Sequence, residues 1–234
     1  MIFHYFCVMN EDMTLKVEVT DDGSATILVT EMDEHYHSIR GALTESNHIY
    51  RDCGFMYRSG QTPGVTTRLL EVGFGTGLNS VVTAMVADEQ SPVHYITMEK
   101  YPLSEDVVSL LQYDKSINGD LFRAIHAAEW NKPVKITPFF TLEKIKGDYV
   151  IDNLPQGIDV VYFDAFAPEK QPEMWSGKAF ERLVSVMNSG GVLTTYCAKG
   201  EIRRMLSGLG LTVERLAGPI GGKREILRAT KFKD

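Results

Sequence analysis

Three glycines spaced two residues apart follow a short apolar run near residue 70, and this stretch is the one whose residues could do chemistry. Residues 69–79 have the sequence LLEVGFGTGLN, and an apolar run suited to a helix comes next. Glycine allows backbone angles that side chains forbid and lets a ligand lie against the main chain. The pattern predicts a strand, a tight ligand-binding loop and a helix, although an ordinary strand-to-helix turn would have the same pattern.

The spacing of the glycines and the acidic residue before them indicate the kind of ligand. The spacing is G-x-G-x-G rather than the G-x-G-x-x-G of dinucleotide-binding loops, and no Lys-Ser/Thr follows, as a P-loop requires. An acidic residue suits a cationic ligand better than a pyrophosphate, and S-adenosylmethionine carries a sulfonium and an ammonium as well as a ribose. We expect this cofactor to be held by Glu71, Gly73, Phe74, Gly75, Gly77 and Asn79.

Two further acidic residues suit the remaining parts of such a cofactor. Glu99 comes 22 residues after Gly77, near the offset of about 20 residues at which a carboxylate binds a ribose diol. It could instead be an acid at the start of a helix, and Lys100 follows it as a second contact. Asp148 stands in a Gly-Asp turn, where it either accepts a hydrogen bond from an adenine amino group or caps the turn.

Asp164 begins the second informative stretch, DAFAPEKQPEMW over residues 164–175. A carboxylate at the end of a strand, next to an aromatic residue and fixed by a proline, can accept hydrogen bonds beside an apolar wall. We predict that Asp164 is the catalytic group and also contacts the cofactor, with Phe166 and Pro168 lining the site. Trp175 is either a core residue or a platform on which a base stacks.

The elements that must position these residues alternate between strand and helix after an opening hairpin. Period-two patterns over 15–19 and 25–29 flank an Asp-Gly turn, which predicts the hairpin. After a polar segment with weak helical signals, we expect an α/β doubly wound sheet of about seven strands. The predicted domains are an N-terminal extension over 1–64 and a Rossmann-like domain over 65–234. The predicted strands are 67–72, 94–98, 134–140, 160–163, 192–197 and an antiparallel pair, 211–216 with 225–230; the predicted helices are 78–88, 103–113, 120–130, 173–187 and 201–209.

Composition narrows the class of protein. The chain has 234 residues, 44% of them hydrophobic, and a net charge of −7, which does not mark a nucleic-acid binder. Residues 199–234, however, contain nine Lys or Arg and four Asp or Glu, so this segment could face an anionic partner. Three scattered cysteines without a CxxC motif favour the reducing cytoplasm and argue against a metal site. The apolar start, residues 1–9, is too short to span a membrane.

The motifs together resemble one family. They are EVGFGTGLN (71–79), EKYPL (99–103), the stretch 164–175, TYCAKG (195–200) and KREI (223–226), with DEHYHS (33–38) further upstream. This combination resembles the methyltransferase domain of the tRNA 5-methylaminomethyl-2-thiouridine biosynthesis protein MnmC, whose stand-alone versions are called MnmD. The resemblance extends from about residue 22 to residue 230 and is more specific than the glycine loop alone.

The resemblance implies a class I methyltransferase fold, S-adenosylmethionine as methyl donor, and tRNA as partner, with the aminomethyl group of a wobble uridine as acceptor. Because the chain ends at Asp234, we expect no oxidase half, so that an upstream tRNA-modifying system supplies the aminomethyl group. The expected substrate-binding residues are Tyr36, His37, Glu45, Phe166, Pro168, Lys170, Trp175, Arg203, Arg204, Lys223 and Arg224. The basic residues among them are candidates for phosphate contacts, which position a tRNA without specifying its sequence.

Two other functions agree with part of the sequence. A class I methyltransferase acting on a small-molecule or protein amine would suit the acidic net charge, and its binding would depend less on salt than tRNA binding does. A non-catalytic module that senses the cofactor would keep the glycine loop but would have no use for Asp164. Nicotinamide-dependent reduction is disfavoured by the glycine spacing.

Overall fold

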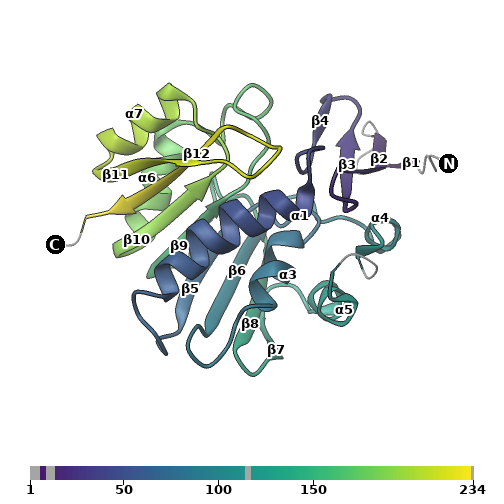
Figure 1. Cartoon of the computed structure of the whole chain (residues 1–234), viewed down its shortest axis with the longest axis horizontal. Helices are drawn as coiled ribbons and strands as arrows, with labels where there is room; N and C mark the ends of the chain where they lie inside the picture. Colours follow the sequence, from purple (N-terminus) through teal and green to yellow (C-terminus); the bar gives the residue numbers. More distant parts are fainter. Residues whose placement is uncertain (1–5, 9–13, 114–116, 233–234) are drawn as a thin grey trace.

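A mixed sheet of eight strands lies at the centre of the computed structural model, which describes residues 6–8, 14–113 and 117–232 (Figure 1). The strands are β5 (Thr67–Val72), β6 (Val93–Glu99), β7 (Pro133–Thr137), β8 (Phe140–Lys146), β9 (Ile158–Phe163), β10 (Met187–Thr195), β11 (Leu211–Ala217) and β12 (Glu225–Lys231). Their order across the sheet is β11-β12-β10-β9-β5-β6-β8-β7.

The order of the strands reverses between β5 and β9. From β5 the chain moves outward through β6 to β8, and it then returns to β9 on the other side of β5. The strands from β10 to β8 are parallel, whereas β7 pairs antiparallel with β8, and β12 pairs antiparallel with both β10 and β11. Ligands of open α/β sheets bind at the carboxyl ends of strands where the order reverses, so the ends of β5 and β9 mark the expected site.

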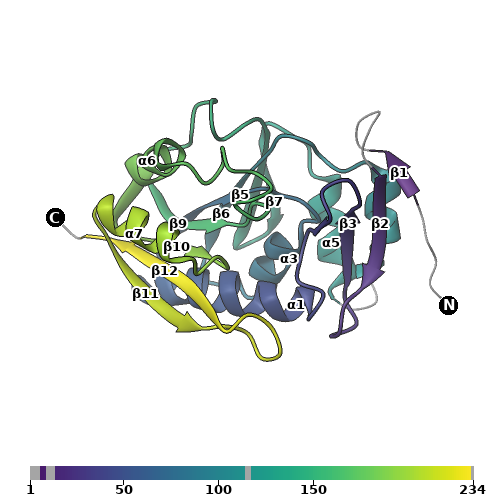
Figure 2. The ribbon, with the colours of Figure 1, turned by 90° about the horizontal axis from the view of Figure 1, so that it is seen from above.

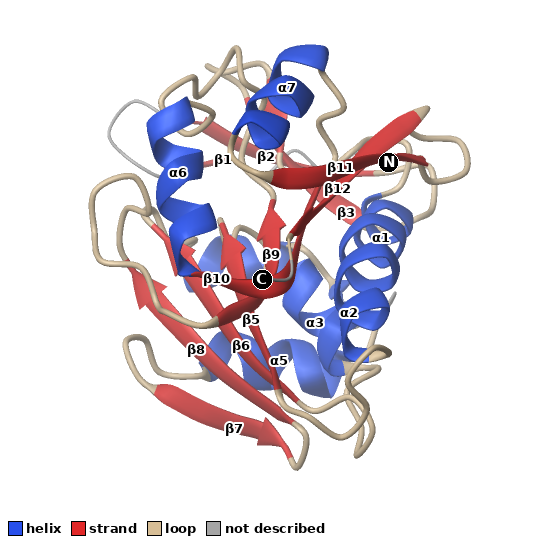
Figure 3. Cartoon of the chain, turned by 90° about the vertical axis from the view of Figure 1, so that its left-hand side faces the viewer, coloured by secondary structure: helices blue, strands red, loops and turns tan. Residues whose placement is uncertain are grey.

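Helices cover both faces of this sheet (Figures 1 and 3). One face carries the continuous helical segment α1 (Ala42–Glu45), η1 (Ser46–Met56) and α2 (Tyr57–Ser59), together with α3 (Leu78–Ala84), α4 (Glu105–Leu110) and α5 (Gly119–Ala127). The other face carries α6 (Gly177–Val186) and α7 (Gly200–Gly208). The side chains of Ser104, Asn118 and Ser176 accept hydrogen bonds at the starts of α4, α5 and α6, and each such cap stabilises its helix by about 1 kcal/mol.

Alternate residues of the central strands enter two different cores. Leu69 packs with Tyr162 and Ile49 on the face of the long helical segment. Leu70 packs with Phe163 on the face of α6 and α7. All five side chains are buried. Burial of each aliphatic or phenylalanine side chain stabilises the fold by about 1.5–3 kcal/mol. Because both faces of the sheet are buried in this way, the packing determines which core each strand residue enters.

A separate four-stranded antiparallel sheet lies beside the start of the long helical segment (Figure 2). Its strands are β1 (Phe6–Val8), β2 (Thr14–Val19), β3 (Ala25–Val29) and β4 (Glu34–His35). Asp22, in the turn between β2 and β3, accepts hydrogen bonds from both the backbone N–H and the hydroxyl of Thr44, each at 2.8 Å. The hairpin is thereby tied to the helical segment.

The predicted fold is confirmed in its alternation of strands and helices and in its terminal antiparallel pair, with two differences. A single strand over 134–140 was expected, but the structure has an antiparallel pair, β7 and β8, because Pro138 lacks an N–H and the chain turns there. The glycines at 190 and 191 were expected to separate a helix from a strand. They lie inside β10 instead, where the pairing with β9 shifts between Met187 and Val192. Of the predicted extension, residues 1–5 and 9–13 lie outside the described part of the chain.

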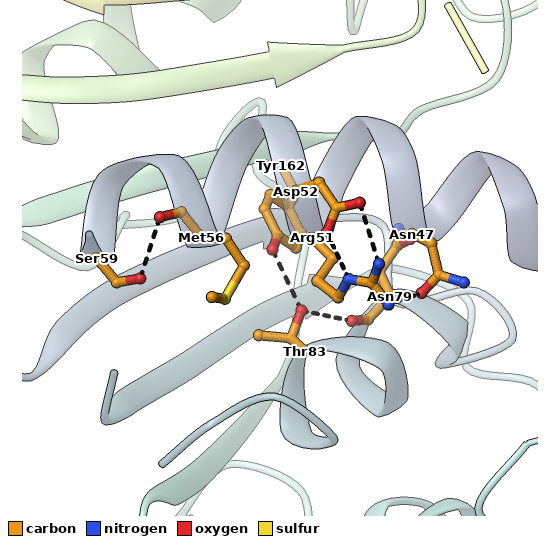
Figure 4. Close-up of polar contacts among 8 residues, drawn as sticks. All are labelled: Asn47, Arg51, Asp52, Met56, Ser59, Asn79, Thr83 and Tyr162. Atoms are coloured by element: carbon orange, nitrogen blue, oxygen red, sulfur yellow. Dashed lines mark hydrogen bonds and ion pairs between the residues drawn. The ribbon is translucent and has the colours of Figure 1, made fainter. Parts of the chain in front are cut away.

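The long helical segment sits unusually close to the sheet at Gly54 of η1. A Cβ atom at this position would lie 2.9 Å from Cε1 of Tyr162 and 3.0 Å from Oγ1 of Thr194. Nearby, the Tyr162 and Thr83 hydroxyls are 3.2 Å apart, which links β9 to α3, and Thr83 also donates to the Asn79 carbonyl (Figure 4). Glycine at position 54 therefore allows the approach of helix to sheet.

We expect Gly54→Ala to lower the free energy of unfolding by about 1–2 kcal/mol, because overpacking outweighs the better helix propensity of alanine. Gly208→Ala is the matched control, since a Cβ there would meet nothing within 4 Å. Chemical denaturation of both variants measures the difference. If Gly54→Ala were as stable as Gly208→Ala, the close packing of η1 on the sheet would be wrong.

Candidate active site

The glycine loop joins β5 to α3 and is held to the neighbouring strand by its own backbone. Gly73, Gly75 and Gly77 have φ angles of 89°, 50° and 73°, a region that glycine enters without strain. The Gly73 N–H donates to the Met98 carbonyl at 2.9 Å, and the Gly75 N–H donates to Glu99 Oε2 at 3.1 Å. The loop therefore lies across the carboxyl ends of β5 and β6.

A cavity of about 490 Å³ opens beside this loop, within the range typical of small-molecule sites. It is lined by eight of the ten residues predicted to bind the cofactor, which are Gly73, Phe74, Gly75, Asn79, Glu99, Lys100, Asp148 and Asp164. Apolar side chains that the sequence did not single out complete the wall: Val29, Met32, Met98, Tyr101, Tyr149, Val150 and Met174. We call this space the larger cavity.

The other two predicted cofactor residues, Glu71 and Gly77, do not line the larger cavity. Glu71 is fully buried on the same sheet face as Leu69, under the long helical segment. Burial raises the pKa of Glu71 well above its usual value, although nearby Thr97 and Asn79 act in the opposite direction. Burial thus favours the neutral form of Glu71 beneath the loop, and Gly77 is the residue from which α3 begins.

Two carboxylates of the larger cavity are fixed by hydrogen bonds. Glu99 accepts from the Gly75 N–H through Oε2 and from the Tyr101 N–H through Oε1, at 3.1 and 2.7 Å. Asp148 forms an ion pair of 2.9 Å with Lys100 and accepts from the Val150 N–H. Partial burial alone would raise the pKa of Asp148, but these two partners outweigh it and the pKa is lowered. Both groups present anchored oxygen atoms to a ligand.

Asp164 follows β9, and each of its oxygens has its own donor. The Tyr50 hydroxyl donates to Oδ1 at 2.7 Å, and the Asn79 side-chain amide donates to Oδ2 at 2.8 Å. Burial raises the pKa of Asp164, while these two donors and the charge of Lys223 hold it down. The donors come from η1 and α3, so the two helices together orient the carboxylate.

A second, smaller cavity of about 230 Å³ meets the larger one at Asp164. Tyr36, His37, Ala165 and Phe166 line both cavities. The rings of Tyr36 and Phe166 are 5.0 Å apart and nearly perpendicular, so they form an aromatic partition. Asp164 is the one carboxylate, within the part of the chain that the structure describes, that faces both spaces.

The smaller cavity is lined mainly by acidic and aromatic groups. Besides Asp164 it contains Asp33, Glu34 and Glu45, and Glu45 is only 6% exposed. Glu45 Oε2 accepts a hydrogen bond from the Ser38 N–H at 2.8 Å, and burial raises the pKa of this carboxyl group. Tyr196 forms the aromatic wall, and its hydroxyl donates to the Ala165 carbonyl at 2.8 Å. This arrangement suits a compact cation.

The remaining residues predicted to bind substrate lie in several places. Lys223 lines the smaller cavity and Lys170 the larger one, whereas neither cavity is lined by Pro168, Trp175, Arg203, Arg204 or Arg224. Trp175 is buried against Phe163, and its indole N–H donates to the Phe166 carbonyl at 2.7 Å. It is a core residue that supports the partition from behind.

Two residues of the candidate site, Tyr50 and Tyr196, were not predicted from the sequence. Tyr50 lies in the polar segment before the sheet, where no pattern distinguishes it from the other tyrosines. Tyr196 belongs to the motif TYCAKG and could have been found from its position just after β10, at the carboxyl edge of the sheet.

The glycine loop is also fixed from beneath, through Thr76. The Thr76 hydroxyl is hydrogen-bonded to His37 Nε2 at 2.7 Å, and the Thr76 carbonyl is 3.0 Å from His126 Nε2. Burial lowers the pKa of both histidines from 6.5 to about 4. The N-terminal segment and α5 thus meet at the loop through two neutral imidazoles.

These histidines make the fold sensitive to acid. The unfolded chain binds a proton at each near pH 6.5, whereas the folded chain binds it only near pH 4. The free energy of unfolding therefore does not depend on these histidines above pH 6.5. It falls as the pH drops towards 4, by about 2 kcal/mol for each histidine at pH 5.

The free energy of unfolding of the unchanged protein should therefore fall between pH 7 and pH 5, and we expect His37→Gln to make that fall smaller by about 2 kcal/mol. Denaturation at both pH values measures it, and an equal loss in both proteins would contradict the burial of a neutral His37.

The larger cavity fits S-adenosylmethionine by the chemistry of its walls. A Cβ at Gly75 would lie 2.9 Å from the Tyr36 ring, and one at Gly73 would lie 3.3 Å from the Asp164 carbonyl. Glycine at both positions avoids this crowding and lets a ligand lie against the backbone. Glu99 offers acceptor oxygens suited to a diol. Tyr101, Tyr149 and Val150 offer the apolar surfaces that a purine requires.

Comparison with known proteins agrees with this assignment. Residues 128–232 match the model of a family described as S-adenosyl-L-methionine-dependent methyltransferase. The chain is 30% identical, over 92% of its own length, to the tRNA 5-methylaminomethyl-2-thiouridine biosynthesis bifunctional protein MnmC of Pseudoalteromonas atlantica, and 28% identical over 86% to that of Actinobacillus pleuropneumoniae. It spans about a third of the length of these curated relatives, 34% and 33% respectively.

Solved structures confirm the predicted fold class. The structure of MnmC2 from Aquifex aeolicus superposes with a TM-score of 0.72 at 23% identity, covering 96% of this chain and 72% of that one. Spermidine synthase from Thermotoga maritima gives a TM-score of 0.62 at 13% identity, covering 98% and 73%. The fold is that of a class I methyltransferase, and the family match confirms the predicted class of enzyme and its methyl donor.

The described residues contain neither a membrane-spanning helix nor a cluster of metal ligands. Over residues 6–8, 14–113 and 117–232, no helix combines the length and apolar character that crossing a bilayer requires. Within the same residues, no three His, Cys, Asp or Glu side chains converge on a point that could hold a metal ion.

Proposed function

The chain belongs with the S-adenosylmethionine-dependent methyltransferases related to the methyltransferase portion of MnmC, and from this relationship we propose its reaction. The enzyme transfers a methyl group to the amine of a 5-aminomethyl group on the wobble uridine, or 2-thiouridine, of a tRNA. The observation that carries the proposal is the position of Asp164, where a cavity suited to the donor meets an acidic cavity suited to an amine. The reaction takes place in the cytoplasm, on tRNA that already carries the aminomethyl group.

The larger cavity holds the donor. Glu99 would accept hydrogen bonds from the ribose hydroxyls, and Asp148 would accept one from the adenine amino group. Gly73 and Gly75 let the donor lie against the backbone, and Asn79 lines the same wall. When bound, S-adenosylmethionine supplies an electrophilic methyl group on a positively charged sulfur.

The smaller cavity holds the acceptor amine. An aminomethyl group is a short alkylamine that carries a positive charge near neutral pH, so the acidic groups around Glu45 attract it. Tyr36 and Phe166 would confine it to the line between the cavities. Confining two reacting atoms to about 3–3.5 Å in the correct direction contributes much of the rate enhancement of such a displacement.

Asp164 acts on the amine at the junction. The bound ammonium first loses one proton to the solvent, by way of Asp164 or water, because only the neutral amine has a lone pair. The Asp164 carboxylate then accepts a hydrogen bond from the amine N–H, which aims the lone pair at the methyl group. It also stabilises the positive charge that develops on nitrogen as the new C–N bond forms and the C–S bond breaks, leaving a neutral thioether. A carboxylate is a weak base towards an alkylammonium ion, so orientation is its main contribution. Tyr50 and Asn79 hold both oxygens in place for this role.

Basic residues at and around the cavities would contact the tRNA backbone. Arg203 and Arg204 lie on α7, which begins at the same edge of the sheet as the cavities, and Arg224 lies in the turn before β12. Lys170 lies in the loop after Asp164. Such contacts position a tRNA without reading its sequence.

The direct test uses tRNA from cells that lack this modification. The protein is incubated with labelled donor and this tRNA, which is then digested and analysed by mass spectrometry. We expect label in 5-methylaminomethyluridine or its 2-thio form. Label transferred only to a small-molecule or protein amine in parallel reactions would support the alternative acceptor instead.

We expect Glu99→Gln to weaken donor binding by about tenfold or more, because it replaces a charged acceptor of ribose hydroxyls with a neutral amide. Calorimetric titration measures the affinity, and the rise in melting temperature with donor should fall in parallel. Glu89→Gln, at an exposed carboxylate outside the cavity, is the control. Equal affinity in both variants would remove Glu99 from the site.

We expect Asp164→Asn to fold and to bind the donor, but to lose turnover by about 10²–10⁴-fold, the usual effect of a positioned acid–base group. Single-turnover methylation of aminomethyl-bearing tRNA, beside donor titration on the same protein, separates the two effects. Turnover within a few-fold of the unchanged enzyme would show that Asp164 only caps the turn after β9.

Tyr50→Phe provides a graded companion to this variant. It keeps the carboxylate but removes the donor that holds the pKa of Asp164 down. The acid limb of the pH–rate profile should therefore move to higher pH, with a smaller loss of rate than in Asp164→Asn. An unmoved profile would mean that ionisation of Asp164 does not control the reaction.

A further inference from the structure

The surroundings of Lys223 are not explained by a phosphate contact alone. Lys223 lies in the turn between β11 and β12, which projects towards α1 (Figures 1 and 2). Its ammonium is 3.4 Å from the centroid of the Tyr196 ring, and the residue lines the smaller cavity. A cation over an aromatic face is attracted by the negative potential of the ring's π-system. The ammonium therefore occupies the cavity proposed for the acceptor.

The charges around this ammonium attract it without locking it in place. Although the residue as a whole is exposed, desolvation of the ammonium lowers the pKa of Lys223, and the carboxyl groups of Glu45, Asp164 and Glu34 oppose that shift. Within the part of the chain that the structure describes, however, Lys223 makes no ion pair of 4.0 Å or less. Its attraction to the cavity comes from the ring and from several acids at longer range, an arrangement that another cation can replace.

We propose that Lys223 holds the place of the acceptor ammonium in the substrate-free protein and is displaced when the acceptor binds. The end of a lysine side chain is a CH₂–NH₃⁺ group, the same chemical group as a protonated aminomethyl substituent. A cavity that accommodates the one on Tyr196 beside Glu45 and Asp164 has the charge and width to accommodate the other. The proposal rests on the proposed function for the identity of the natural acceptor, but not for the binding of primary ammonium ions.

The turn allows this displacement by rotation of the side chain alone. The Gly218 N–H donates to the Arg224 carbonyl at 3.0 Å, and the Gly222 N–H donates to the Pro219 carbonyl at 3.0 Å. A Cβ on Gly218 would lie 1.7 Å from the Lys223 carbonyl oxygen, so the turn closes tightly around the backbone of Lys223. The long side chain retains many rotamers. When it rotates out of the cavity, it carries its charge to the mouth, where the phosphates of a bound tRNA would lie.

Removing the Lys223 side chain should therefore have opposite effects on two ligands. A small ammonium ion no longer competes with a resident cation, so it binds more tightly. A tRNA phosphate no longer has this ammonium as a partner, so the tRNA binds more weakly. A purely structural lysine, or one that binds only phosphate, would not produce this pair of changes.

The first experiment titrates propylammonium chloride into the full-length protein by calorimetry at constant ionic strength. We expect the Kd to fall by about tenfold in Lys223→Ala, the effect of removing one competing charge at close range. It should stay within about twofold of the unchanged protein in Lys223→Arg, which keeps the charge. Lys178→Ala, at an exposed lysine of α6, controls for loss of a distant charge and should leave the Kd unchanged. An equal or higher Kd in Lys223→Ala, or no saturable binding by that variant, would overturn the proposal.

The second experiment measures tRNA binding by the same variants as a function of salt. Lys223→Ala should bind more weakly and show a salt slope smaller by about one, as expected when one phosphate fewer is neutralised by the protein. A salt slope unchanged by Lys223→Ala would overturn the outward position of the side chain. Neither titration requires methyl transfer, so tighter propylammonium binding by Lys223→Ala would stand even if the tRNA proved not to be methylated. Methylation without that tightening would leave the proposed function intact and remove this inference.

Discussion

Two hydrogen bonds to one carboxylate determine how the rest of this structure has to be arranged. Asp164 accepts from Tyr50 at one oxygen and from Asn79 at the other, and these donors are separated from it by more than 80 positions in the sequence. Bringing them together requires that η1 and α3 pack side by side on the same face of the sheet, as Figure 4 shows near Asn79 and Thr83. The close approach of η1 to the sheet at Gly54, and the adjacency of β5 and β9 in the sheet, also bring these donors to Asp164. Burial raises the pKa of Asp164, and the two donors oppose that shift and so favour a carboxylate at the junction of the two cavities.

The division of the site into two cavities depends on the N-terminal segment. Tyr36 and His37 follow β4, and Tyr36 packs against both Gly75 and Phe166. His37 reaches Thr76 in the glycine loop, and Glu45 of α1 supplies a buried carboxyl group to the smaller cavity. The sheet alone would offer a donor site open to water. The N-terminal segment adds a wall to this site and builds most of the smaller cavity, the one proposed for the acceptor.

The sequence predicted the parts of the site that depend on local chemistry. The glycine loop, Glu99 and Asp164 were recognisable because each combines a distinctive residue type with the end of an apolar strand. Glu71 has the same local signature, but the pleat turns it into the core under the helical segment, and alternation within a buried strand cannot be assigned to a face from sequence alone. Tyr50 and the partition of Tyr36 against Phe166 depend on tertiary packing between distant segments, which no local pattern encodes. The hairpin of β7 and β8 was missed because Pro138 was included in one apolar run, although a proline there breaks a strand.

In the reaction that we propose, donor and acceptor occupy different cavities that meet at Asp164. The most direct measurement is a crystal structure of the protein with the demethylated donor, S-adenosylhomocysteine, and the nucleoside 5-aminomethyluridine. We expect the thioether sulfur in the larger cavity and the amine nitrogen in the smaller one, with the nitrogen facing the sulfur along the direction of methyl transfer and within hydrogen-bonding distance of Asp164. A nucleoside bound with its amine away from Asp164, or both ligands bound in the larger cavity, would contradict this arrangement.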